Sequence, residues 1–224
     1  MNIYLLPIYA VLIGIGLVAL LRQKKTTYSK LLLPFSGAFL LALTLFDLLP
    51  EVYEHLEAKQ TGLFIMCGIL MQIILEFFSK GAEHGHVHIH KNSKAFPWLL
   101  FISLCLHAFL EGFPIHQHND MVYSVLIHKI PIAILITTYL VQSDFKPLQI
   151  LSFLTLFGIM TPLGTVISNN VAMVSDYLVY INAIVIGVFL HISTTILFES
   201  SEGHKFNLNK ILAIIVAITI AYFI

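Results

Sequence analysis

Residues 106–115 read LHAFLEGFPI, and they place a histidine and a glutamate four positions apart in an otherwise apolar run. Residues at i and i+4 of a helix lie on one face, so we expect His107 and Glu111 to be neighbours. Ionisable side chains inside a membrane-spanning helix are costly and are candidates for a functional site. The segment therefore raises two questions: whether the chain lies in a membrane, and what stabilises these two side chains there.

The composition of the whole chain indicates a membrane protein. Of its 224 residues, 58% are hydrophobic and only 11% are charged, whereas about 25% are charged in a typical soluble domain. The formal net charge is zero, which gives no sign of a nucleic-acid partner. Cys67 and Cys105 both lie in apolar runs and form no disulfide framework. We therefore predict an all-α, polytopic protein in a lipid bilayer, with no nucleic-acid partner.

Apolar runs separated by short charged or turn-rich breaks predict eight transmembrane helices in one compact bundle. The first run has no basic residue before it and is long enough to cross a bilayer, so we expect a retained helix rather than a signal peptide. The whole chain, 1–224, is predicted to form a single transmembrane domain. The expected helices are 2–21, 31–50, 61–79, 97–115, 121–141, 148–168, 177–198 and 209–224.

The basic residues predict the orientation of these helices, because Lys and Arg are retained on the cytoplasmic side. One set of alternate loops carries only Lys59, and Lys129 lies inside an apolar run. Both termini are therefore expected outside a plasma membrane, with the loop at 80–96 in the cytoplasm. The other set of alternate loops carries Arg22, Lys24, Lys25, Lys30, Lys80, Lys91, Lys94, Lys146, Lys205 and Lys210.

A further histidine, His128, lies in the expected helix that follows His107 and Glu111. Two imidazoles and one carboxylate on adjacent helices suit a divalent transition-metal ion. Pro131 cannot donate a hydrogen bond to the carbonyl of Ile127, which either bends the helix or provides another oxygen ligand. The alternative is that His107 and Glu111 only hydrogen-bond to each other and brace the bundle.

Other polar residues fall within or beside the expected helices. The cytoplasmic loop is rich in histidine, which is typical of loose metal capture, although a solvated loop without a role has the same composition. Further carboxylates and imidazoles in the apolar runs are likewise candidates for a functional site. The loop residues are His84, His86, His88 and His90, and the ionisable residues of the other expected helices are Asp47, Glu51, Glu76, His191 and Glu199.

These motifs resemble those of the ZIP (Zrt/Irt-like) family of divalent metal transporters. HAFLEG at 107–112 is similar to the family motif His-Asn-x-x-(Glu/Asp)-Gly, and HKIPIA at 128–133 is similar to His-Glu-x-Pro-His-Glu. DLLPE at 47–51 resembles the family's HLLPE. Eight helices, both termini outside and a His-rich loop after the third helix also agree with the family. The chain thus looks like a divergent, prokaryotic-type member.

The resemblance implies a metal site that is reduced compared with the family's two-metal centre. His107, Glu111 and His128 match ligands of the first metal. Ala108 stands where the family has Asn, Ile132 and Ala133 replace a His-Glu pair, and Thr161 stands where the sixth helix often has Glu. Lys129 replaces a glutamate ligand of the second metal. The remaining site is therefore expected to be mononuclear.

Lys129 has two interpretations. Its ammonium can supply the positive charge of the missing second metal, with Glu111 as its partner, or its side chain can extend to the membrane interface.

The resemblance implies transport of a divalent metal ion into the cytoplasm, with Zn²⁺ first and Fe²⁺, Mn²⁺ or Cd²⁺ as alternatives. It also implies an ion path, with Asp47 and Glu51 on the way to the site and Glu76, His191 and Glu199 on the way out. It also implies a homodimer, although the sequence indicates no interface. Loss of the second-metal ligands equally suits a non-transporting metal sensor. A membrane metalloenzyme is a further alternative, since two histidines and a carboxylate also bind catalytic zinc, but no separate general base is evident.

Overall fold

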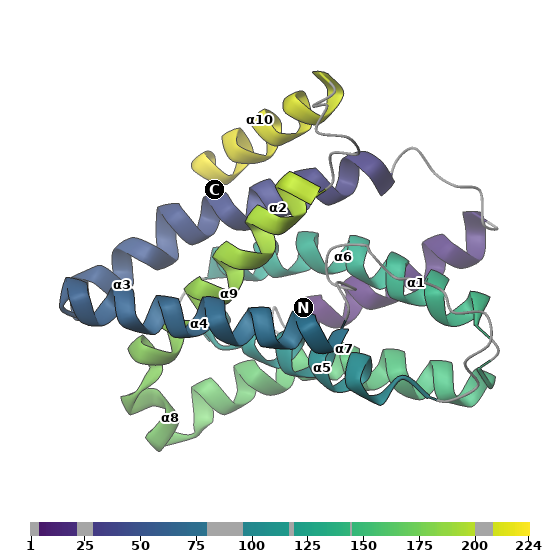
Figure 1. Ribbon diagram of the computed structural model, residues 1–224, viewed down its shortest axis with the longest axis horizontal. Coiled ribbons are helices and arrows are strands. Elements are labelled where there is room, and N and C mark those ends of the chain that lie inside the picture. Colours follow the sequence, from purple (N-terminus) through teal and green to yellow (C-terminus); the bar gives the residue numbers. More distant parts are fainter. Residues whose placement is uncertain (1–4, 22–28, 80–95, 117–118, 144, 200–207) are drawn as a thin grey trace.

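The computed structural model describes residues 5–21, 29–79, 96–116, 119–143, 145–199 and 208–224. Within these ranges all regular structure is helical, as predicted (Figure 1). The α-helices are α1 (Leu6–Leu21), α2 (Ser29–Leu43), α3 (Leu49–His55), α4 (Ala58–Ser79), α5 (Trp98–Leu110), α6 (Asn119–Gln142), α7 (Pro147–Asn170), α8 (Ala172–Asp176), α9 (Leu178–Glu199) and α10 (Leu208–Phe223).

In the described part of the chain, five helical stretches are long and apolar enough to cross a membrane. They are Leu31–His55, Ala58–Phe78, Asp120–Gln142, Pro147–Asn170 and Leu178–Phe198. Three shorter helices, α1, α5 and α10, are also apolar. Each of the eight predicted spans therefore corresponds to an apolar helical stretch, and five of these have the length of a membrane span.

The ends of two predicted spans differ from the structure by five residues each, and proline contributes to both. The second span continues to His55 through a π-helical segment, Thr44–Leu48, in which the Leu49 N–H donates to the Thr44 carbonyl. Pro50 follows in the first turn of α3, where its missing N–H leaves the preceding carbonyls to find other partners. The fourth span was predicted to reach residue 115, but α5 ends at Leu110 because Gly112 and Pro114 do not favour a continued helix.

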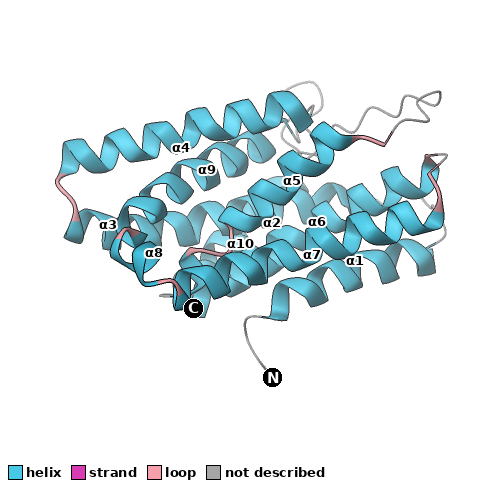
Figure 2. Cartoon of the chain, turned by 90° about the horizontal axis from the view of Figure 1, so that it is seen from below, coloured by secondary structure: helices cyan, strands magenta, loops and turns pink. Residues whose placement is uncertain are grey.

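The helices pack in two groups with separate hydrophobic cores. One core joins buried side chains of α2, α9 and α10 with those of the first turns of α6, and α4 packs along α9. The other core joins α1, α5, α6 and α7. Figure 2 shows α1 and α7 on one side of the molecule and α4 with α9 on the other. Helix α6 contributes to both cores, and the two groups also touch where α4 packs on α5.

Glycines allow two close helix crossings, one in each group. A Cβ atom added to Gly187 of α9 would lie 2.1 Å from the carbonyl oxygen of Ile65 in α4, close to Gly68. A Cβ atom on Gly164 of α7 would lie 2.1 Å from the carbonyl oxygen of Phe109 in α5. Small residues let helices approach closely in membranes. The second crossing fixes α7 against the end of α5, where the candidate site begins.

Candidate metal centre

The predicted ligands come from two neighbouring helices of one group. His107 lies in the last turn of α5, and Glu111 is the residue that caps the C-terminus of this helix, with its N–H donating to the His107 carbonyl. His128 lies near the middle of α6, which continues through Pro131. All three side chains are at most 1% exposed. The structure therefore brings His128 together with residues 17 and 21 positions before it in one buried cluster, which we call the central cluster.

The distances in the central cluster suit a single metal ion. Nε2 of His107 lies 2.9 Å from Oε1 of Glu111, and Nε2 of His128 lies 3.8 Å from the same oxygen. One potential ligand atom from each residue lies within 4.8 Å of the others. Zinc binds nitrogen and oxygen ligands at about 2.0–2.2 Å, so atoms at these separations can surround one ion after small side-chain adjustments.

The orientation of His107 favours ion binding over a brace within the helix. Its Nε2 atom contacts Oε1 of Glu111 at 2.9 Å, whereas its Nδ1 atom has no hydrogen-bond partner among the described residues. Buried polar atoms without partners are rare and costly. A brace between Nε2 and Glu111 leaves Nδ1 without a partner, whereas a metal ion could use a ring nitrogen of His107 as a ligand.

Lys129 lies beside the central cluster and does not extend to the surface. Its side chain is 1% exposed, and Nζ is 2.8 Å from Oε2 of Glu111. The ammonium also lies 4.5 Å from the centre of the Phe157 ring, a cation–π distance. Glu111 thus directs one oxygen to the two histidines and the other to Lys129. This arrangement leaves one carboxylate oxygen for a metal ion.

Helix α7 supports the site through hydroxyl groups rather than through ligands. Thr161 Oγ1 donates a hydrogen bond to the Ala108 carbonyl at 2.7 Å, and Thr165 Oγ1 donates to the Gly112 carbonyl at 2.8 Å. Both hydroxyls satisfy carbonyls at the end of α5 that lack partners within that helix. Sequence reasoning noted only that Thr161 is not a carboxylate. The TPLGT stretch, with its glycine between two threonines, is the signal that could have identified this contact.

The predicted path residues lie outside the central cluster. Glu76 of α4 and His191 of α9 form an ion pair with 2.6 Å between Oε2 and Nε2. Asp47 lies in the π-helical segment and Glu51 in the first turn of α3. Glu199 is the last residue of α9, and its side chain lies outside the described part of the structure, as do the four loop histidines.

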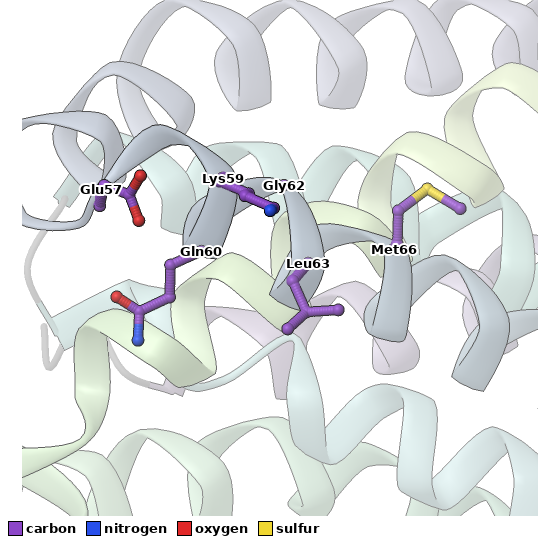
Figure 3. Close-up of a pocket in the computed structure, with 6 residues that line it drawn as sticks. All are labelled: Glu57, Lys59, Gln60, Gly62, Leu63 and Met66. Atoms are coloured by element: carbon purple, nitrogen blue, oxygen red, sulfur yellow. The ribbon is translucent and has the colours of Figure 1, made fainter.

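A separate surface pocket lies at the beginning of α4 (Figure 3) and has a volume of about 640 Å³. Leu63 and Met66 in its wall are about 60% exposed, so the pocket is an open hollow and contains none of the predicted ligands. Its lining residues are Glu57, Lys59, Gln60, Gly62, Leu63 and Met66.

Comparison with known proteins connects the chain with zinc transporters. No protein-family model matches it. It is 36% identical over 88 residues to zinc transporter ZIP1 of Danio rerio, a match that covers 37% of this chain and 29% of that protein. It is 30% identical over 95 residues to zinc transporter ZIP1 of Takifugu rubripes, covering 40% and 32%. The chain thus spans less than a third of the length of these curated relatives, whose names describe transporters and not enzymes, and the matches support the resemblance to the ZIP family.

Proposed function

We propose that the chain is a transmembrane transporter of divalent transition-metal ions, with Zn²⁺ as its first substrate. The observation that carries this proposal is the central cluster of His107, Glu111 and His128, buried between apolar helices of a membrane protein. The names of the two relatives support zinc. The same nitrogen and oxygen donors also accept Fe²⁺, Mn²⁺ or Cd²⁺, so these ions are the alternative substrates.

The proposed topology has eight spans, with both termini outside the plasma membrane. The three shorter apolar helices, α1, α5 and α10, then complete the set begun by the five longer stretches. The distribution of Lys and Arg supports this orientation and a cytoplasmic His-rich loop, which would capture released ions. The resemblance to the ZIP family supports transport towards this loop and assembly as a homodimer.

The two packed helix groups suggest how an ion crosses. The central cluster belongs to the group formed by α1, α5, α6 and α7, and the two helices that carry it, α5 and α6, contact α4 and α2 of the other group. Movement of one group against the other would expose the cluster first to one side and then to the other. Asp47 and Glu51 would guide the ion to the cluster, and Glu76, His191 and Glu199 would guide it away.

Lys129 would make the site suitable for transport of one ion at a time. Its ammonium holds one oxygen of Glu111 and supplies a fixed positive charge beside the three ligands. A divalent ion is repelled by this charge, so it is bound less tightly than by an uncompensated carboxylate and is released more easily. The site would then hold one metal ion per protomer, with water or the Ile127 carbonyl completing its coordination.

Zinc uptake into proteoliposomes tests the proposal. We expect the wild-type chain to accumulate zinc, and the His107→Ala variant to lose this uptake because one of three protein ligands is removed. His55→Ala is the matched control, since this histidine is exposed at the end of α3 and contacts a carbonyl of its own helix. Equal uptake by the wild type and by His107→Ala would contradict the proposal.

A metal sensor on the same scaffold is the second candidate, and the Lys129–Glu111 ion pair is the observation that favours it. A pair that locks the site in one conformation would allow binding without release to the other side. Zinc bound by the wild-type protein without uptake into proteoliposomes would support the sensor and reject the transporter.

A further inference from the structure

We propose that Glu76, His191 and Gln72 form a second binding site for a divalent transition-metal ion, between α4 and α9. We call this the α4–α9 site. It extends the proposed function, because it would receive an ion that leaves the central cluster. The three residues belong to the other helix group, so the two sites would lie on opposite sides of the contact between the groups.

The ion pair at the centre of the α4–α9 site joins residues that are far apart in the sequence. Oε2 of Glu76 lies 2.6 Å from Nε2 of His191, and the side chains are 24% and 19% exposed. From the crossing of Gly68 and Gly187, His191 is one helical turn further along α9 and Glu76 two turns further along α4. The crossing therefore fixes the helices that carry the pair, and the partial exposure shows that the described helices do not fully cover the two side chains.

Gln72, on the same face of α4 as Glu76, provides an independent observation. It lies one turn before Glu76 on the same face of α4 and is 0% exposed. Neither the oxygen nor the nitrogen of its amide has a hydrogen-bond partner in the described structure. An unpartnered buried amide is costly, and a membrane offers no water to compensate it. A bound cation would satisfy the amide oxygen and explain why this helix carries a glutamine at a buried position.

The three donors define the class of ion. An imidazole nitrogen, a carboxylate oxygen and an amide oxygen suit Zn²⁺, Mn²⁺ or Fe²⁺, and the absence of sulfur among these three donors disfavours Cu⁺. Two ligand atoms on one tetrahedral zinc ion, each about 2.0–2.1 Å from it, lie roughly 3.3 Å apart. The present 2.6 Å between Nε2 and Oε2 is a hydrogen-bond distance. Ion binding therefore requires the two side chains to separate by less than one ångström.

Helices α4 and α5, which carry Glu76 and His107, pack directly against each other. Ser103 Oγ donates a hydrogen bond to the Leu75 carbonyl at 2.6 Å, which joins α5 to α4 beside Glu76. Ser103 is one turn before His107 on α5, and four residues of helix span about 6 Å. An ion released from His107 would thus reach the level of Glu76 after a displacement of about one helical turn.

Zinc titration by calorimetry tests the α4–α9 site in the full-length protein in detergent. All variants carry alanine at the four loop histidines (84, 86, 88 and 90), so that the loop does not bind the probe. In a background that also carries His107→Ala and His128→Ala, we expect one zinc per protomer to remain. We expect His191→Gln to abolish this binding and Gln72→Leu to weaken it about tenfold. His55→Ala is the matched control and should leave it unchanged.

His191→Gln separates a metal site from a structural brace. The glutamine amide can still donate a hydrogen bond to Glu76, so an unchanged melting temperature would show that the fold is intact. Residual zinc binding that survives His191→Gln, or no residual binding in the background, would overturn the inference. If the proposed function is wrong because the central cluster binds no zinc, the result is different. The loop-substituted protein then binds the same number of zinc ions with and without the changes at His107 and His128.

Discussion

Replacing Lys129 by methionine is expected to destabilise the metal-free protein and to tighten zinc binding. The substitution leaves the Glu111 carboxylate buried, at 1% exposure, without its ammonium partner. Breaking a buried ion pair in this way costs about 3–5 kcal/mol. Zinc would restore the missing positive charge, so its affinity should rise by at least about tenfold, which corresponds to 1.4 kcal/mol. Release should become slower for the same reason.

Thermal unfolding with and without zinc measures this effect. Zinc should raise the melting temperature of Lys129→Met more than that of the wild type, because bound ligand stabilises only the folded state. Lys129→Arg is the matched control, since it keeps the charge although its geometry differs. Equal stability and equal zinc affinity of Lys129→Met and the wild type would reject a role for this ammonium as a counter-charge.

Glu111→Gln is expected to reduce both stability and zinc binding. The change removes the anionic ligand and the partner of Lys129 while it preserves the size of the side chain. Removal of a residue that only supports a metal ligand costs about 10–100-fold in affinity, so loss of this ligand should cost more than about 100-fold. The buried Lys129 would lack a counter-ion, which again costs about 3–5 kcal/mol.

A double variant distinguishes the two effects of Glu111→Gln. Adding Lys129→Met removes the unpaired ammonium, so most of the lost stability should return. Zinc binding should not return, because the carboxylate ligand is still absent. If the change in stability of the double variant equals the sum of the changes in the two single variants, Glu111 and Lys129 are not coupled. Recovery of zinc binding in the double variant would show that Glu111 is not a ligand.

The sequence was most informative where function depends on local spacing. The i,i+4 spacing of His107 and Glu111 and the position of His128 in the following apolar run were sufficient to predict a shared site, and the structure brings these side chains together. The partnership of Lys129 with Glu111 was predicted from the resemblance to the ZIP family. In each case the relevant residues lie on two consecutive helices joined by a short connection, which restricts how they can pack.

Features that depend on contacts between distant helices could not be predicted in this way. The hydrogen bond from Thr161 to the Ala108 carbonyl joins residues 53 positions apart, and the Glu76–His191 pair joins residues 115 positions apart. Gln72 appeared as one polar residue in an apolar run, and only its burial shows that it faces other helices. Helical periodicity gives the face on which a residue lies, but not the helix that will cover this face.

X-ray absorption at the zinc edge tests the central claim most directly. The sample is the full-length protein with alanine at the four loop histidines, loaded with one equivalent of zinc. We predict two histidine nitrogens and one carboxylate oxygen among the ligands at about 2.0–2.2 Å, and loss of this histidine signal in His107→Ala/His128→Ala. We also predict no second metal at about 3.5–4 Å, the separation in two-metal sites. A zinc–zinc signal at that distance, or a spectrum unchanged by the double substitution, would contradict a single ion held by His107, Glu111 and His128.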